Sequence, residues 1–292
     1  MINPNPVSGA KQPLVSVVMA AHNEENYIGE AIASILSQTY QHLELIVVDD
    51  YSSDRTCEVV RSFSDPRVVL YVKRCELPGE IATRNIAVEL ARGELVAYQD
   101  ADDTSHPCRL QRQVAEWQAG ERPRIVGSWI QRKLAGQSRT FRLPVPHAEI
   151  VAGFYRLYDR ATFVSGTMLL PRRLALAVPG RPRFRYFGDW DQLCRLEELG
   201  EAEFRNVPEV LFTYNIRTKG CKGQVEWARY NAFERACRAR RRAGRAEWET
   251  AEEFESYLQR SPWEWAQWRA LRGLLGIKVR LEMLPLRRSH SK

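Results

Sequence analysis

Short apolar segments alternate with helical patterns through the first third of the chain, and a polar cluster follows three of these apolar segments. The β-branched, apolar segments lie at residues 14–19, 45–48, 68–72 and 94–98, and helical periodicity predicts helices over 23–36, 55–63 and 81–91. This alternation predicts an α/β fold with a doubly wound, mostly parallel sheet. The polar clusters occupy residues 20–24, 49–54 and 99–103. Because ligands bind beyond the carboxyl ends of such strands, the three clusters predict one ligand site.

The third cluster reads Gln-Asp-Ala-Asp-Asp over residues 99–103, directly after an apolar strand. Asp100 and Asp102 are two residues apart, so at an extended strand end their side chains can point the same way. Paired hard oxygen ligands suit Mg²⁺ or Mn²⁺ that is also held by a diphosphate. A solvated turn rich in aspartate is the structural alternative for the same residues. Asp100 and Asp102 are therefore the candidate metal ligands.

The chain contains neither a membrane span nor a metal motif based on cysteine. Its longest apolar stretch, residues 14–21, is too short to cross a bilayer, and the N-terminus lacks the basic-then-apolar pattern of a secretory signal. The six cysteines form no CxxC motif, which predicts reduced thiols without a zinc site. These features predict a cytoplasmic protein.

The remaining pattern divides the 292-residue chain into three parts. A loose leader covers 1–12, and a body covers 13–218 with halves at 13–108 and 109–218. In the second half we expect helices over 109–119 and 192–199, a strand over 125–130, and one or two short strands within 202–214. A helical C-terminal extension covers 219–292, with a break at residues 261–262.

The C-terminal extension is basic and rich in tryptophan. It holds 17 Lys and Arg against 9 acidic residues, and five of the eight tryptophans. Positive charge with Trp at helical spacing predicts an interfacial helix on an anionic membrane surface. The alternative is a helical pair packed on the core with its arginines facing water. No nucleic-acid-binding module is recognised, so we expect no nucleic-acid partner.

Five ordered blocks resemble the family 2 glycosyltransferases: residues 15–24, 35–40, 44–54, 82–85 and 93–103. The resemblance covers roughly residues 13–215 and is strongest before about residue 110. It implies a GT-A fold, in which a Rossmann-like nucleotide-binding half is fused to an acceptor-binding half. Such enzymes move a sugar, with inversion, from a nucleotide-diphosphate donor that is usually UDP-linked. The implied acceptor is a saccharide or a lipid-linked saccharide in surface polysaccharide or glycolipid synthesis, at the cytoplasmic face of the membrane.

The resemblance also implies where the donor nucleotide binds. Asp50 would accept a hydrogen bond from uracil, although a cap for the following helix is the alternative. The Ala20 backbone would contact the base. Asn23 and Glu24 lie in the same loop, where Asn23 is also a plausible helix N-cap and Glu24 favours a helix start. Arg84 would pair with the base or a phosphate, or else be a surface arginine.

For the metal and the diphosphate, the resemblance implies that Asp100 contacts both donor and metal and that Asp102 binds the metal directly. Arg217 stands where relatives carry a histidine that can be a third metal ligand. Because arginine stays protonated, it cannot ligate a cation. Either water completes the metal shell, or Arg217 pairs with the diphosphate.

Inversion requires a base that deprotonates the acceptor hydroxyl. By resemblance Asp189 is that base, and Asp191 is the competing candidate. Gly188 replaces the family's usual glutamate, and Trp190 either stacks on an acceptor sugar or anchors its helix. Helix capping is the structural alternative for both aspartates.

Two other functions are compatible with such a fold. A sugar nucleotidyltransferase also places paired carboxylates there, but residues 20–24 lack the glycine-rich phosphate loop typical of those enzymes. A non-catalytic nucleotide-binding module is the second alternative, which Gly188 and Arg217 keep open.

Overall fold

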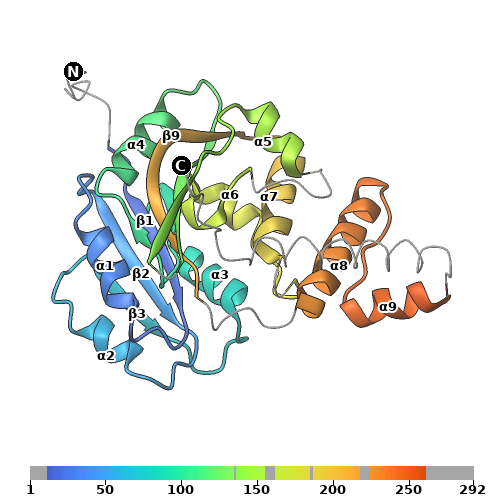
Figure 1. The fold of residues 1–292 in the computed structure, drawn as a ribbon, viewed down its shortest axis with the longest axis horizontal. Helices are drawn as coiled ribbons and strands as arrows, with labels where there is room; N and C mark the ends of the chain where they lie inside the picture. Colours follow the sequence, from blue (N-terminus) through green and yellow to red (C-terminus); the bar gives the residue numbers. More distant parts are fainter. Residues whose placement is uncertain (1–11, 135, 155–161, 185–186, 218–223, 261–292) are drawn as a thin grey trace, which may run out of the picture.

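A continuous curved sheet runs through the part of the chain that the structure, a computed structural model, describes: residues 12–134, 136–154, 162–184, 187–217 and 224–260 (Figure 1). Within these residues the sheet has nine strands in the order β3-β2-β1-β4-β8-β6-β9-β5, with β7 paired to β6. The strands are β1 (Val15–Ala21), β2 (Leu43–Asp49), β3 (Val68–Val72), β4 (Leu95–Tyr98), β5 (Thr104–Ser105), β6 (Arg124–Leu134), β7 (Gln137–Phe141), β8 (Leu169–Pro171) and β9 (Glu203–Asn215). The four strands from β3 to β4 are parallel, and β8 pairs antiparallel with both β4 and β6.

Helices cover both faces of this sheet (Figure 1). The helices are α1 (Ile28–Leu36), α2 (Thr56–Arg61), α3 (Glu80–Leu90), α4 (Arg109–Gln118), α5 (His147–Phe154), α6 (Arg172–Ala177), α7 (Gly188–Leu199), α8 (Gln224–Arg242) and α9 (Ala251–Arg260). Along β1, Val15, Val17 and Met19 belong to the core under α1, α2 and α4, whereas Val18 belongs to the core under α3 and α5 to α7. Burial on both faces explains why the parallel strands are nearly continuous apolar runs.

The strand register brings the three polar clusters to one edge of the sheet. Ala21 at the end of β1 pairs with Asp49 at the end of β2, and Val18 pairs with Tyr98 at the end of β4. The chain therefore leaves all three strands on the same side. This confirms the α/β prediction with a mostly parallel sheet. The sheet continues from β4 into β8 and β6, so the two predicted halves share one sheet.

Several predicted boundaries were wrong. The helix after β1 begins at Ile28, and Asn23 is not its N-cap: Asn23 has φ 56° and its Oδ1 accepts a hydrogen bond from the Ser53 backbone N–H. Helix α7 begins at Gly188, four residues before the predicted start at residue 192, and its end at Gly200, with φ 69°, is as expected. A single long strand, β9 (Glu203–Asn215), stands where one or two short strands were predicted, because it pairs with β6 along most of its length.

The C-terminal helices α8 and α9 enclose a small aromatic core of their own. Phe184 in the loop before α7 packs with Phe233 of α8 and Phe254 of α9. The basic run at the end of α8 is partly neutralised, because Arg241 pairs with Glu198 and Glu247. No helix among the described residues is long and apolar enough to span a membrane. The predicted leader, the break at 261–262 and the tryptophans at 263, 265 and 268 lie outside those residues, apart from Gln12.

A buried carboxyl on α8 makes the stability of this region sensitive to pH. Glu234 is 0% exposed, and neither of its carboxylate oxygens has a hydrogen-bond partner within the described structure. Burial raises the pKa of Glu234 to about 7, although Arg238 acts in the opposite direction. A raised folded-state pKa means that stability is complete below the ordinary pKa of 4.5 and falls as the pH rises toward 7.

We therefore expect Glu234→Gln to be more stable than the parent at pH 8, by about 1–3 kcal/mol in the free energy of unfolding. Near pH 4.5 the difference should vanish, because the parent carboxyl is then protonated. Urea unfolding of both proteins between pH 4.5 and 8 measures this. A stability difference that does not change with pH would contradict the assignment.

Candidate active site

A large cleft opens at the carboxyl edge of β1, β2 and β4. Its volume is about 2090 Å³. Eight of the residues singled out from the sequence line it: Ala20, Asn23, Glu24, Asp50, Asp100, Asp102, Asp189 and Arg217. Arg84 reaches this group from α3 through an ion pair with Asp100, and Asp191 is not among the lining residues. Segments up to 193 positions apart in the chain thus meet in one cavity.

Asp50, at the end of β2, is fixed by two donors on one side of the cleft. Lys73 Nζ lies 2.8 Å from Asp50 Oδ1, and the Gly79 backbone N–H donates to Oδ2 at 2.8 Å. Lys73 is itself buried and also donates to Thr83 Oγ1 at 3.0 Å. Each carboxylate oxygen keeps a further lone pair for an N–H donor such as a pyrimidine imide. At the start of α2 the Thr56 N–H donates to Asp54 Oδ1 and not to Asp50.

Asp100 lies two residues after the end of β4, and Arg84 of α3 holds its side chain in place. Arg84 Nη2 donates to Asp100 Oδ1 at 2.9 Å and to Glu80 Oε1 at 2.6 Å, and its guanidinium lies over the Tyr98 ring. Arg84 is buried, so it is not the surface arginine of the alternative interpretation. The other oxygen, Oδ2, faces Gly166, where a Cβ would come within 2.7 Å of it. A glycine is thus required at this position for Asp100 to face the cleft.

Asp102 is bound by Arg217, the residue at the position where the resemblance implied a histidine. Arg217 Nε and Nη2 lie 2.8 and 2.5 Å from Asp102 Oδ2, and Nη2 also lies 2.7 Å from Glu24 Oε1. Burial raises the pKa of Glu24, while the Arg217 guanidinium opposes the shift. The guanidinium therefore already balances part of the negative charge between the first and third polar clusters.

The loop that carries these carboxylates rests on two buried groups. Asp103 Oδ1 accepts from the Asn215 N–H at 2.7 Å, and burial together with Asp100 and Asp102 raises the pKa of Asp103. Arg109, on α4, is 0% exposed and donates to the Tyr98 and Gly166 carbonyl oxygens at 2.8 and 3.2 Å. These contacts fix both the end of β4 and the glycine that faces Asp100.

The donor set can hold a divalent ion together with a diphosphate. Within the described part of the chain, Asp100 Oδ2 and Asp102 Oδ1 take part in no hydrogen bond or ion pair, and Glu24 Oε2 is buried without a hydrogen-bond partner. Mg²⁺ and Mn²⁺ are commonly held by one or two carboxylates with substrate phosphates as further ligands. Within the described part of the chain no cluster of three or more His, Cys, Asp or Glu side chains could hold an ion alone. The residues thus fit an ion that arrives with the diphosphate.

Asp189 lies in the first turn of α7 and lines the same cleft as Asp100 and Asp102, the candidate metal ligands. Ser165 Oγ donates to its Oδ2 at 2.8 Å, and the Trp190 backbone N–H donates to its Oδ1 at 2.8 Å. Burial raises the pKa of Asp189, and the Ser165 hydrogen bond opposes the shift. Trp190 lines the cleft and also packs edge-on against Phe154, so it has parts of both predicted roles.

Gly188 precedes Asp189 at the position where the resemblance implied a glutamate, and the packing favours glycine there. A Cβ at this position would come within 2.7 Å of Ile81 Cγ1 on α3. A larger side chain would push α7 away from α3 and with it Asp189.

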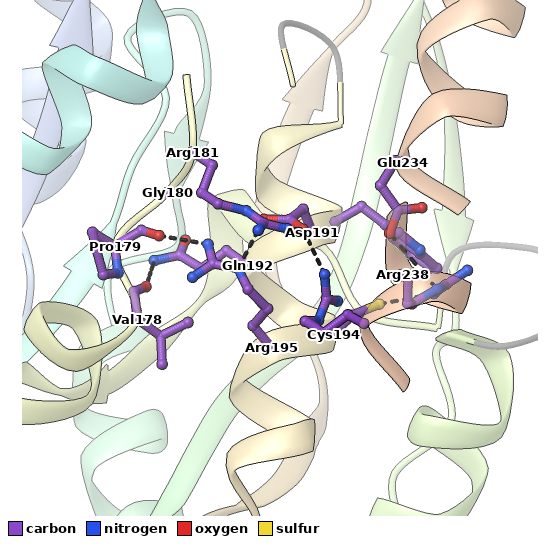
Figure 2. A network of polar contacts seen from close by, with 12 residues as sticks. Val178, Pro179, Gly180, Arg181, Asp191, Gln192, Cys194, Arg195, Glu234 and Arg238 are labelled. Carbon is purple, nitrogen blue, oxygen red and sulfur yellow. Dashed lines mark hydrogen bonds and ion pairs between the residues drawn. The ribbon is translucent and has the colours of Figure 1, made fainter. Parts of the chain in front are cut away.

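Asp191, the competing candidate for the base, has a structural environment (Figure 2). It is 0% exposed, and its Oδ2 accepts from Arg181 Nε at 2.8 Å and from Arg195 Nε at 2.9 Å. Figure 2 shows both arginines converging on this carboxylate, with Cys194 and Arg238 beside them. Both guanidinium groups hold this carboxylate among residues that do not line the cleft, so it is not placed to contact an acceptor hydroxyl. The geometry therefore favours Asp189 over Asp191.

Three supporting residues were missed in the sequence. Lys73 follows β3 at the same sheet edge as Asp50, a position that could have drawn attention. No local sequence pattern marks Ser165 or Arg109, because each contacts a residue distant in the chain. Ser165 donates to Asp189, and Arg109 donates to the Gly166 carbonyl oxygen.

Comparison with known proteins agrees with this fold. The family model described as glycosyl transferase family 2 matches residues 16–177, more than half of the chain. The chain therefore belongs to this family of glycosyltransferases, and the predicted family is confirmed. Asp189 and Arg217 lie beyond the matched segment.

Individual relatives match different shares of the chain. An uncharacterized glycosyltransferase of Haemophilus influenzae is 29% identical over 218 residues, which is 70% of this chain and 66% of that protein. The Escherichia coli UDP-Glc:alpha-D-GlcNAc-diphosphoundecaprenol beta-1,3-glucosyltransferase WfgD is 39% identical over 102 residues, covering 35% of this chain and 40% of that protein. Across the relatives compared, the chain spans between 31% and 66% of their length.

A solved structure confirms the fold. The mannosyltransferase PcManGT of Pyrobaculum calidifontis, in complex with GDP-Man and Mn²⁺, superposes with a TM-score of 0.57 at 20% identity, covering 80% of this chain and 66% of that one. At this identity the similarity concerns architecture alone, and it bears out the predicted GT-A fold.

Proposed function

We propose that this chain transfers a sugar, with inversion, from a UDP-linked donor to a hydroxyl of a saccharide or lipid-linked acceptor in surface polysaccharide or glycolipid synthesis. The observation that carries the proposal is the meeting of Asp50, Asp100, Asp102 and Asp189 in one cleft at the carboxyl edge of the sheet. The acceptor named for WfgD, a lipid diphosphate saccharide, supports the acceptor class.

Residues from the three polar clusters, at 20–24, 49–54 and 99–103, form the donor end of the cleft. Asp50, fixed by Lys73 and Gly79, presents acceptor oxygens for the N–H of the base. The Ala20 backbone and Asn23 flank the same space. Asp100 and Asp102 would hold Mn²⁺ or Mg²⁺, which supplies Lewis-acid stabilisation of charge on the leaving diphosphate. Arg217 adds a fixed positive charge at the same place.

Asp189 performs the proton transfer in this mechanism. Its carboxylate takes the proton of the acceptor hydroxyl while the acceptor oxygen forms a bond to the anomeric carbon. The bond from that carbon to the diphosphate oxygen breaks, and the nucleoside diphosphate leaves with the electron pair. Attack opposite the leaving group inverts the anomeric configuration. The raised pKa of Asp189 makes it a stronger base than an exposed aspartate at neutral pH.

The membrane and compartment predictions stay predictions. Arg240 stacks on Trp248, and Arg241 is ion-paired, so the described part of α8 offers less free charge than its sequence suggests. The tryptophan-rich segment that carried the docking prediction lies outside the described residues. A cytoplasmic enzyme peripheral to the inner membrane face remains our working hypothesis, with no nucleic-acid partner.

A panel of nucleotide sugars tests the donor site by thermal shift, with and without Mn²⁺. A ligand present at about 100 times its Kd stabilises the folded state by about 2.7 kcal/mol, so we expect a rise of several degrees in Tm for the cognate UDP-sugar. Mn²⁺ should enlarge the shift.

Two outcomes distinguish the alternatives. No shift with any nucleotide would contradict the donor site. A shift without turnover on any acceptor would favour a binding module, and release of pyrophosphate from a sugar phosphate and a nucleoside triphosphate would favour a nucleotidyltransferase.

A further inference from the structure

Three arginines line the end of the cleft that is formed by the β6–β7 hairpin. Arg132 lies on β6, Arg139 lies on β7, and Arg142 follows β7 directly. They share the cavity with Asp189 but belong to other elements than the donor-side carboxylates. An acceptor whose hydroxyl reaches Asp189 would therefore lie in the same cavity as these arginines.

The hairpin register places two of these positive charges directly opposite each other. Arg132 pairs with Arg139 across the two strands, so both side chains project from the same face. Like charges in directly opposed positions destabilise a strand pair. Each guanidinium also lies over the Phe141 ring, at 5.0 Å for Arg132 and 5.4 Å for Arg139. The shared aromatic surface holds the two cations side by side.

These arginines differ from the arginines at the donor end. Arg84 and Arg217 are each ion-paired to two carboxylates. For Arg132, Arg139 and Arg142, the contacts within the described residues are to the rings of Phe141, Tyr214 and Trp129, and none is an ion pair. Among the described residues that line the cleft, carboxylates gather at the donor end, whereas the three hairpin arginines form no ion pair there.

We propose that Arg132, Arg139 and Arg142 bind a phosphate or diphosphate group of the acceptor, and so select an acceptor saccharide that is phosphorylated at its reducing end. Guanidinium groups match phosphate oxygens in bidentate geometry, and several of them together match the multiple charge of a diphosphate better than the single charge of a sugar carboxylate. This inference rests on the proposed function and adds the acceptor group that the cleft recognises.

The test compares acceptors that share one sugar. Three synthetic acceptors carry the same saccharide with an alkyl diphosphate, an alkyl phosphate or a neutral alkyl group at the reducing end, and a fourth carries a uronic acid. For the parent enzyme we expect the lowest KM with the diphosphate. In Arg132→Gln/Arg139→Gln, KM for the diphosphate acceptor should rise about 10- to 100-fold, while kcat and the KM for donor stay within about two-fold.

A matched variant separates a local contact from loss of charge in general. Arg61→Gln/Arg74→Gln removes the same charge from exposed positions outside the cleft and should leave every KM unchanged. If the hairpin variant does not fold, competition in the parent replaces it: a short-chain alkyl diphosphate should inhibit competitively against the neutral acceptor.

Equal KM values for the neutral and diphosphate acceptors in the parent would overturn the proposal, as would equal losses for both acceptors in the hairpin variant. A preference for the uronic acid would assign the site to carboxylates instead. In each case transfer to the neutral acceptor would leave the proposed function intact, whereas absence of transfer to every acceptor would count against that function itself.

Discussion

Asp189→Asn is expected to lower kcat by about 10²- to 10⁴-fold, because the variant can no longer take the proton of the acceptor hydroxyl. Asparagine has nearly the same shape, and its amide oxygen can still accept the hydrogen bond that Ser165 donates at 2.8 Å. The fold and the donor end of the cleft should therefore be preserved. Steady-state kinetics with saturating UDP-sugar, together with calorimetry of UDP binding, measures the two effects separately.

Asp191→Asn is the matched control for this substitution, since it makes the same change two residues along the same helix. Its carboxylate is buried between Arg181 and Arg195, so the expected cost is about 3–5 kcal/mol in the free energy of unfolding and not a loss of chemistry. Folded Asp191→Asn protein should retain most of the parent kcat. Retained turnover in Asp189→Asn, or a folded but inactive Asp191→Asn, would reverse the assignment of the base.

Asp102→Asn is expected to weaken Mn²⁺ binding in the presence of UDP by about 10- to 100-fold and to lower kcat/KM by about 10²-fold or more. The substitution removes the charge that a divalent ion requires and also frees Arg217 from its contacts with Asp102 Oδ2 at 2.5 and 2.8 Å. Electron paramagnetic resonance of Mn²⁺ titrated into the UDP complex reports the metal directly, independently of turnover.

Asp65→Asn provides the control, because Asp65 lies in the loop before β3 and outside the cleft. It should leave Mn²⁺ affinity unchanged. If Asp102→Asn bound Mn²⁺ as tightly as the parent, Asp102 would not be a metal ligand, and its partner Arg217 would be the main cation at the diphosphate.

The sheet and the place of the site could be predicted because both depend on local periodicity. Apolar runs of strand length alternating with helical patterns specify a parallel sheet, and the sheet edge then collects residues 20–24, 49–54 and 99–103. No long-range information was needed for Asp50, Asp100 and Asp102 to be found in one cleft.

The start of α1 could not be predicted in the same way, because side chains from another loop decide it. The Asn23 N–H donates to Ser52 Oγ, and the Glu24 N–H donates to Thr56 Oγ1. These bonds across about thirty positions hold the segment as a loop, whereas its own sequence favours a helix. For the same reason the sequence could not decide whether Asp189 or Asp191 is the base, because the contact between Asp191 and Arg181 of the preceding loop depends on the tertiary fold.

The number of strands after residue 200 was also set by tertiary pairing. The sequence suggested one or two short strands, but β6 pairs with β9 from Glu203 to Asn215, and two register shifts after Val207 accommodate the unpaired residues. The hairpin arginines had no interpretation in the sequence, because only the register shows that Arg132 and Arg139 lie opposite each other.

The most direct test of the account is a crystal structure of the protein soaked with UDP and Mn²⁺, with anomalous diffraction used to locate the metal. We expect the uracil beside Asp50, an anomalous peak between the diphosphate and the carboxylates of Asp100 and Asp102, and Asp189 across the cleft from the diphosphate. Nucleotide bound away from Asp50, or Mn²⁺ bound at a position that neither Asp100 nor Asp102 contacts, would contradict the central claim.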